Sequence, residues 1–181
     1  MNLLLSPHND DETLFTSFTI LRERPLVVFL TDSFIQLNRG DGITAEERNK
    51  ESKQAMEVLN CDYIFANLRD DLLSRDVLRD YFKELVKFNP DKVYAPKPYL
   101  NGNEHHNMVG EIAEKMFGDK VVFYATYTKD NLYTTGKTEI KPTNKELILK
   151  RQALQCYRSQ LSLGATRPHF EAVLGQSEFY D

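Results

Sequence analysis

The sequence has no tryptophan, only two cysteines and only four histidines among its 181 residues. Cys61 and Cys156 lie far apart and outside any Cys-x-x-Cys pair, which argues against a disulfide framework and favours two reduced thiols. No apolar run is long enough to cross a bilayer, and no basic region precedes the opening leucines as it would in a signal peptide. We therefore expect a cytoplasmic protein with no membrane partner.

The chain also lacks a large excess of charge of either sign. The chain has 23 Lys and Arg against 27 Asp and Glu, a net charge of -4, and no run of basic residues. Because nothing in this pattern would neutralise a phosphate backbone, nucleic acid is not an expected partner. The chain does have a hydrophobic content of 41%, with 11 Phe and 9 Tyr, which is enough for the core of one domain spanning residues 1–181.

Short apolar runs alternate with segments of helical period along most of the chain. The runs predict five strands, at residues 2–6, 26–30, 62–65, 92–95 and 121–127. Helices are predicted at 13–21, 44–59, from 74 up to Asn89-Pro90, around 108–117 and at 143–157. This alternation is typical of right-handed crossovers and a parallel sheet.

The predicted fold class is therefore α/β, a Rossmann-like, mainly parallel sheet of about five strands in the order 3-2-1-4-5 with helices on both faces. A polar loop is expected at residues 31–42. Residues 128–181 are expected to form a C-terminal arm and a helix, and the tail from Leu163 is expected to be irregular. The Tyr- and Thr-rich residues 124–138 are either an edge that joins a homo-oligomer or a covered hairpin.

Two polar loops carry the candidate chemistry. Ser6-Pro-His-Asn-Asp-Asp-Glu12 follows the first strand, and Asn101-Gly-Asn-Glu-His-His106 follows the fourth. In open α/β sheets, ligands bind at the carboxyl ends of the strands, where the strand order reverses. Strands one and four are neighbours in the predicted order, so we expect these two loops to face each other.

Three residues of these loops form a candidate metal site. Two imidazoles, one carboxylate and an open position are typical of catalytic zinc, and His8, Asp11 and His106 would supply the three ligands. Asp10 would point elsewhere and could accept a proton from a water molecule. Magnesium is a poorer match because it prefers oxygen ligands. The alternative is that the acids only favour the positive end of the next helix, and that His105 and His106 only cap or solvate the start of their own helix.

At these residues the sequence resembles the PIG-L or LmbE-like family of metal-dependent N-acetylglucosaminyl deacetylases. The family motif His-Pro-Asp-Asp-Glu stands here as His8-Asn-Asp-Asp-Glu12, and its motif His-Pro-Asp-His stands as Asn103-Glu-His-His106. Weaker similarities are Thr31-Asp32, Arg48 with Glu51, Lys150-Arg-Gln-Ala-Leu154 and Tyr157-Arg-Ser-Gln160.

The resemblance implies a role for each matched residue. His8, Asp11 and His106 would bind one Zn²⁺ per chain, Asp10 would be the general base, and Arg48 would contact the substrate. Asn103 replaces the family histidine that is assigned to oxyanion stabilisation or proton donation, and an amide can donate a hydrogen bond but not a proton.

Other residues near the predicted crevice have two interpretations each. His105 stands where the family has an Asp, and it is either the missing catalytic acid or a solvated loop residue. Asp32 either contacts a sugar hydroxyl or stabilises its own turn. Arg69-Asp-Asp71 is a surface turn first and a substrate contact second, and His169 is expected on the surface.

The predicted function is zinc-dependent removal of an N-acetyl group from a small-molecule conjugate of N-acetylglucosamine type. The first alternative is a sugar- or nucleotide-binding protein on the same metal-binding scaffold that has lost catalysis, as the Asn103 replacement suggests. A metal phosphoesterase is less favoured, because we find neither ligands for a second metal nor a phosphate-binding glycine loop.

Overall fold

A computed structural model describes residues 1–34, 42–128, 133–164 and 166–181. Its centre is a seven-stranded sheet in the order β3-β2-β1-β4-β5-β7-β6. The first five strands are parallel and are β1 Leu3–Ser6, β2 Leu26–Thr31, β3 Tyr63–Leu68, β4 Val93–Pro96 and β5 Val121–Tyr124. The predicted α/β class and the order 3-2-1-4-5 are thus confirmed. The predicted polar loop at residues 31–42 lies largely outside the described residues.

Two further strands extend the sheet beyond β5. These are β6 Thr138–Ile140 and β7 Glu178–Tyr180, and β7 pairs antiparallel with both β5 and β6. The prediction of an irregular tail is therefore wrong, since α7 Arg167–Ala172 and β7 both lie in it. The predicted strand at 121–127 is also too long. Both α7 and β7 are short, and β7 also buries a charged residue, so neither has a recognisable hydrophobic period in the sequence.

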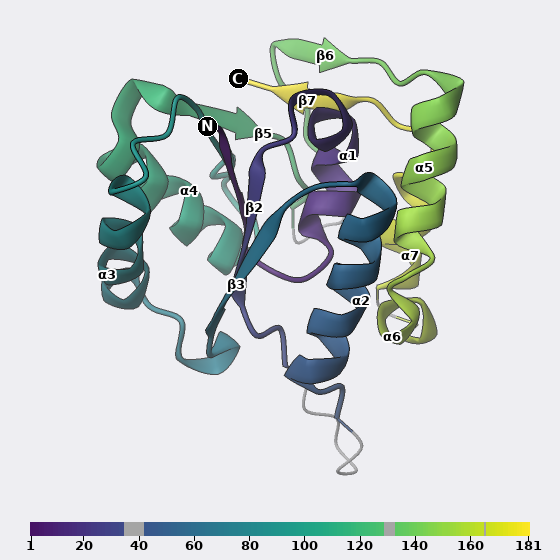
Figure 1. Ribbon diagram of the computed structural model, residues 1–181, viewed down its shortest axis with the longest axis horizontal. Helices are drawn as coiled ribbons and strands as arrows, with labels where there is room; N and C mark the ends of the chain where they lie inside the picture. Colours follow the sequence, from purple (N-terminus) through teal and green to yellow (C-terminus); the bar gives the residue numbers. More distant parts are fainter. Residues whose placement is uncertain (35–41, 129–132, 165) are drawn as a thin grey trace.

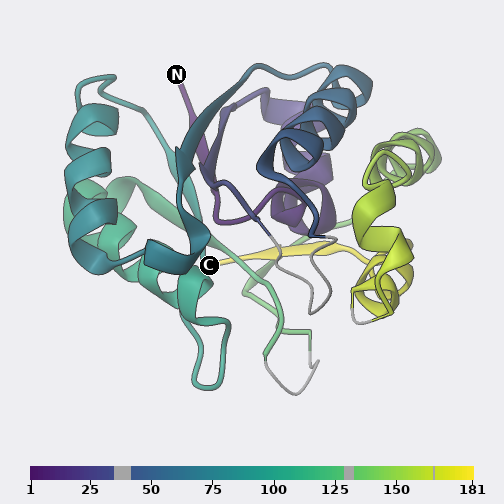
Figure 2. The ribbon, with the colours of Figure 1, turned by 90° about the horizontal axis from the view of Figure 1, so that it is seen from below.

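Helices cover both faces of the sheet (Figure 1). On one face lie α3 Arg75–Val86 and α4 Glu104–Phe117; on the other lie α1 Asp11–Glu23, α2 Ala45–Leu59 and α5 Asn144–Leu154. The view turned by 90° shows α6 Arg158–Ser162 and α7 beside α5, on the same side of the sheet (Figure 2). Short 3-10 helices lie at Asp70–Leu72 and Gly118–Lys120. The predicted helix 143–157 ends earlier, at Leu154, because the chain turns there into α6.

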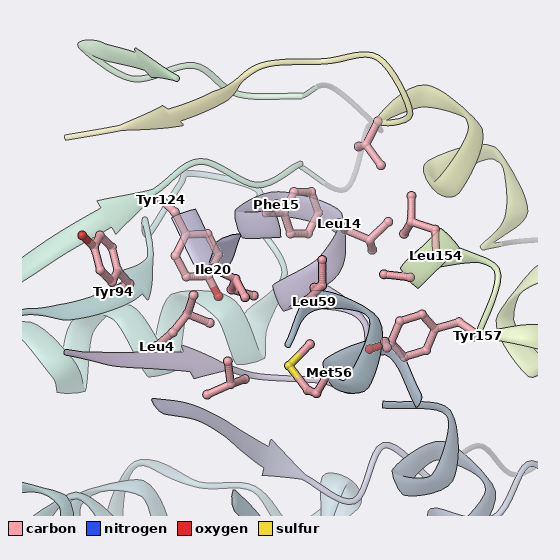
Figure 3. Close-up of a cluster of buried hydrophobic side chains, with 14 of the residues drawn as sticks. Leu4, Leu14, Phe15, Ile20, Met56, Leu59, Tyr94, Tyr124, Leu154 and Tyr157 are labelled. Carbon is pink, nitrogen blue, oxygen red and sulfur yellow. The ribbon is translucent and has the colours of Figure 1, made fainter. Parts of the chain in front are cut away.

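The sheet separates two hydrophobic cores. Alternate residues of a strand enter opposite cores, so Leu4 packs toward α1, α2 and α5 while Leu3 and Leu5 pack toward α3 and α4. Figure 3 shows the first core, where side chains of α1 and α2 meet Leu154 and Tyr157. Both cysteines are free, as predicted. Among the described residues, none of the helices combines the length and apolar character that a membrane crossing needs.

Helix α1 is interrupted inside the molecule. Thr16 has non-helical dihedral angles, with φ at -138° and ψ at 18°. In a regular helix the carbonyl oxygen of Leu14 would accept a hydrogen bond from Phe18 N–H, but here it accepts one from Lys150 Nζ at 2.7 Å. Lys150 is 1% exposed, and burial lowers its pKa to about 8. An amine from α5 therefore caps the first half of α1.

A carboxylate caps the second half of α1. The side chain of Glu178, in β7, accepts hydrogen bonds from Phe18 N at 2.6 Å and from Thr19 N at 3.1 Å. Burial raises the pKa of Glu178, and the charge of Lys150 opposes that rise. At the break, the first half-helix presents a carbonyl group to the Lys150 amine, and the second half-helix presents N–H groups to the Glu178 carboxylate. Each charge therefore faces the end of a helix whose dipole favours it.

Helix α5, which carries Lys150, begins with a capping box. Thr143 Oγ1 accepts from Glu146 N at 3.3 Å, and Glu146 Oε2 accepts from Thr143 N at 2.7 Å. We expect Thr143→Ala to lower the free energy of unfolding by about 1 kcal/mol, because one helix N–H loses its acceptor. Urea denaturation would measure this change. The exposed neighbour substitution Lys145→Ala is the control, and an equal loss in both variants would contradict the capping explanation.

Candidate metal centre

The two predicted loops meet at the carboxyl ends of β1 and β4. His8 lies between β1 and α1, Asp11 is the first residue of α1, and His106 lies in the first turn of α4. The rings of His8 and His106 are 5.4 Å apart between centroids. Gly110 allows α4 to approach β4 this closely, because a Cβ atom there would lie 2.2 Å from the carbonyl oxygen of Pro96.

One carboxylate oxygen joins the two imidazoles. Oδ2 of Asp11 lies 3.2 Å from Nδ1 of His8 and 3.1 Å from Nε2 of His106, and the three donor atoms lie within 4.8 Å of one another. Burial opposes ionisation of Asp11, but the hydrogen bonds and charges of the two histidines outweigh it and hold its pKa well below the usual range. The carboxylate is therefore ionised and ready to bind a cation.

The donor set fits a metal ion that accepts nitrogen and oxygen ligands. His106 is 1% exposed; its Nδ1 has no hydrogen-bond partner in the described part of the chain, and its Nε2 faces the carboxylate of Asp11. A buried imidazole that is only partly satisfied is costly, and metal coordination would add a partner. Two imidazoles and one carboxylate with an open position are typical of catalytic zinc.

Asp10 lies beside His8, Asp11 and His106, but its side chain points away from their donor atoms. Its φ of 150° is unusual for a residue other than glycine and turns its side chain from the donor atoms toward α2. There its Oδ2 accepts a hydrogen bond from Nη2 of Arg48 at 3.2 Å. Burial raises the pKa of Asp10 to about 6, against the opposing charge of Arg48. A carboxyl group with this pKa can exchange a proton near neutral pH.

Arg48 is itself 2% exposed and lines the pocket in front of the donor set. Among the described residues, its Nε and Nη1 have no hydrogen-bond partner. One turn further along α2, the carboxylate of Glu51 accepts from Ser159 N at 2.7 Å and from Ser159 Oγ at 2.6 Å. This contact brings the neighbouring Gln160 to the pocket wall. The Arg-x-x-Glu and Ser-Gln patterns of the sequence thus lie against each other.

The pocket has a volume of about 240 Å³ and is formed from both ends of the chain. His8, Asp10 and Asp11 line it from the first loop, and Gln160, His169 and Phe170 line it from the C-terminal segment. A volume of this size is small for a ligand site and suits a small molecule rather than a polymer.

The other predicted site residues have contacts of their own. Asn103 lines the pocket, and its Oδ1 caps α4 by accepting from His105 N at 2.9 Å and His106 N at 3.3 Å. Asp32 Oδ1 accepts from Phe34 N at 3.3 Å and Asp70 N at 3.0 Å. Asp32 thus holds the turns after β2 and β3, and it is not among the described residues that line the pocket.

His105 lies on the far side of His8. Its Nδ1 is 3.0 Å from Nε2 of His8, and Oδ1 of Asp70 lies 3.5 Å from His8 Nε2 and 3.6 Å from His105 Nδ1. His105 and Asp70 line a second opening that shares His8 with the pocket. Burial and the charge of His8 lower the pKa of His105. An imidazole that binds a metal ion through one ring nitrogen is commonly held by a hydrogen bond at the other nitrogen. His105 and Asp70 are placed to hold His8 in this way.

Two pocket residues did not stand out in the sequence. Asp70 was expected to be a surface turn, yet its Oδ1 is buried and lacks a hydrogen-bond partner in the described part of the chain. The expectation that His169 lies on the surface is wrong, because it is half-buried and lines the pocket. No motif surrounds His169, and only the return of the chain through α7 brings it to the site.

Taken with the α/β sheet, these residues define a candidate metal centre at the carboxyl ends of the parallel strands. The model of the PIG-L family, described as GlcNAc-PI de-N-acetylase, matches residues 3–117. The chain belongs to this family, and it is a metal-dependent N-deacetylase by class. No curated protein is similar enough to the chain to match it.

Several solved structures share the fold over 99% of this chain. N,N'-diacetylchitobiose deacetylase from Pyrococcus horikoshii has 21% identity, a TM-score of 0.76 and 82% of its length covered. The deacetylase Orf2*T of the teicoplanin biosynthetic pathway has 16% identity, a TM-score of 0.77 and 95% covered. GalB, the 4-carboxy-2-hydroxymuconate hydratase from Pseudomonas putida, has 16% identity, a TM-score of 0.73 and 94% covered. Because these identities are low and one neighbour is a hydratase, the likeness shows the fold alone.

Proposed function

We propose that this protein is a zinc-dependent hydrolase that removes an N-acetyl group from an N-acetylglucosamine-type conjugate. The products would be acetate and the free amine. The observation that carries this proposal is the convergence of the His8, Asp11 and His106 donor atoms beside Asp10, at the wall of one small pocket. Membership of a de-N-acetylase family supports an acetamide as the reacting group. The chitobiose deacetylase supports an acetylated amino sugar as substrate.

Each residue of the site has a part in the proposed reaction. His8, Asp11 and His106 would hold the zinc ion, which supplies Lewis acidity when bound. Asp10 takes the proton of the attacking water, since it lies beside the ligand set and outside it. Arg48 orients Asp10 through Nη2, and its Nε and Nη1 are left for an oxygen of the substrate. The water oxygen bonds to the amide carbon; when the C–N bond then breaks, the proton that Asp10 took passes to the leaving nitrogen, and the products are acetate and the free amine.

A second candidate function is a sugar-binding protein on the same metal-binding scaffold that has lost catalysis. The observation that favours it is Asn103, which caps α4 where the family has a histidine. The two functions differ in turnover. Tight zinc binding with no acetate release from a panel of N-acetylated amino sugars would favour the binding protein. Acetate release that stops on chelation would favour the hydrolase.

We expect purified protein to bind one zinc ion per chain and His106→Ala to lose this binding, because His106 supplies one of three ligands. Zinc per chain by elemental analysis and Kd by chelator competition would measure the effect. The matched control is His105→Ala on the same helix turn, which should keep the stoichiometry and weaken binding about 10–100-fold through His8. Two zinc ions per chain, falling to one in His105→Ala, would contradict a single centre and indicate a second one at His8, Asp70 and His105.

A further inference from the structure

Amide hydrolysis needs a hydrogen-bond donor at the carbonyl oxygen that reacts, besides the N–H groups of Arg48, which also lines the pocket. As water attacks an acetamide, negative charge develops on the carbonyl oxygen, and an oriented N–H group stabilises it. The two residues that the sequence offers for this role, Asn103 and His105, are held by contacts of their own. Oδ1 of Asn103 caps α4, and Nδ1 of His105 faces His8 at the second opening. This inference rests on the proposed function and asks which residue supplies the donor.

His169 is anchored in the pocket by two tyrosines. Its Nδ1 lies 2.9 Å from the hydroxyl oxygen of Tyr133, and the same hydroxyl lies 3.3 Å from the His169 carbonyl oxygen. Its ring packs against Tyr127 with centroids 4.6 Å apart, and Tyr127 packs edge-on against His106 at 5.7 Å. One aromatic ring therefore separates His169 from a predicted metal ligand, and the position of His169 is held from two sides.

The remaining ring nitrogen of His169 is available to a ligand. Among the described residues that line the pocket, His169 is the only imidazole outside the predicted metal set. The Tyr133 hydroxyl can donate to the His169 carbonyl oxygen or to the nearer Nδ1, and donation to Nδ1 leaves the ring proton on Nε2. Burial lowers the pKa of His169, which favours the neutral ring in this role. A neutral imidazole can polarise a carbonyl group through its N–H.

We propose that Nε2–H of His169 donates a hydrogen bond to the acetamide oxygen of the substrate and stabilises the charge that develops there. His169 is then a catalytic residue contributed by α7, which lies outside the region matched to the family model. Tyr133 is a positioning residue, because it acts on the substrate only through the orientation and tautomer of His169.

The experiment compares variants at position 169 by steady-state acetate release from an N-acetylated amino sugar. His169→Phe keeps a ring against Tyr127 and removes both nitrogens, and His169→Gln keeps one N–H donor. We expect His169→Phe to lower kcat by about 10²- to 10³-fold with little change in KM, and His169→Gln to recover part of that loss. Tyr133→Phe should lower kcat by a smaller factor. Arg167→Ala, an exposed change on the same helix, is the control and should match the wild type.

Zinc per chain and the thermal midpoint are measured on every variant. Unchanged zinc and stability with a lowered kcat would support the proposal. Wild-type kcat in His169→Phe would overturn it and leave the proposed function intact. A loss of zinc in proportion to the loss of kcat would also overturn it, since His169 would then act on the metal site. A wild type that releases no acetate from any acetylated sugar would overturn the proposed function, and this inference with it.

Discussion

Asp10→Asn is expected to lower kcat for acetate release by about 10²- to 10⁴-fold while one zinc ion per chain remains bound. The amide keeps the size and the hydrogen-bond acceptor that Arg48 needs, but it cannot take a proton from water. The loss should therefore fall on the chemical step and leave the three ligands in place. Steady-state kinetics and elemental analysis of the same preparation would measure both quantities.

The control for Asp10→Asn is Asp71→Asn. Asp71 follows the carboxyl end of β3, as Asp10 follows that of β1. Its carboxylate is exposed and pairs only with Arg69 among the described residues. The same change there should leave kcat and zinc content unaltered. Full activity in Asp10→Asn would remove Asp10 from the role of general base. Loss of zinc in that variant would instead make Asp10 a metal ligand.

Lys150→Met is expected to lower the free energy of unfolding by about 3–5 kcal/mol. Methionine matches the length of the lysine stem but leaves the Leu14 carbonyl without its donor. The substitution also leaves the buried carboxylate of Glu178 without the positive charge that opposes its burial. When one of two buried groups that stabilise each other is removed, the other keeps its full desolvation penalty without compensation. Urea denaturation followed by circular dichroism would measure the change.

The matched control is Lys145→Met, which places the same side chain on an exposed turn of α5 and should change stability by no more than about 0.5 kcal/mol. The double variant Lys150→Met with Glu178→Gln tests whether the two charges act together. Because it removes both charges, it should cost less than the sum of the single losses. Strict additivity, or a Lys150→Met variant as stable as the control, would show that the two charges do not jointly support the break in α1.

The parallel sheet and the two facing loops could be predicted from the sequence because their signals are local. Buried strands such as Leu26–Thr31 are continuous apolar runs, and parallel order follows from their alternation with helices. The loop with His8 and the loop with His106 then had to meet, since neighbouring parallel strands end at one edge of the sheet. The spacing within each loop is readable without knowledge of the rest of the chain.

The C-terminal part of the site could not be predicted in the same way. Strand β7 has three residues, and its Glu178 occupies a buried position where a sequence pattern requires an apolar residue. Its contacts with Phe18 and Thr19 span about 160 positions, beyond the reach of any periodicity. His169 lies on a helix of six residues that has no apolar period of its own. Such residues are placed by tertiary contacts, which a local pattern does not encode.

The break in α1 also bears on the order in which the chain acquires its structure. The groups that close the break come from α5 and β7, so a chain emerging from the ribosome has its first strands, its first helix and His106 long before it has Lys150 and Glu178. Until then the open N–H and C=O groups of α1 face water, and the pocket lacks its wall of Gln160 and His169. The nascent chain thus contains His8, Asp11 and His106, the three proposed metal ligands, before it has the complete pocket, so metal binding can precede the ability to bind the proposed substrate.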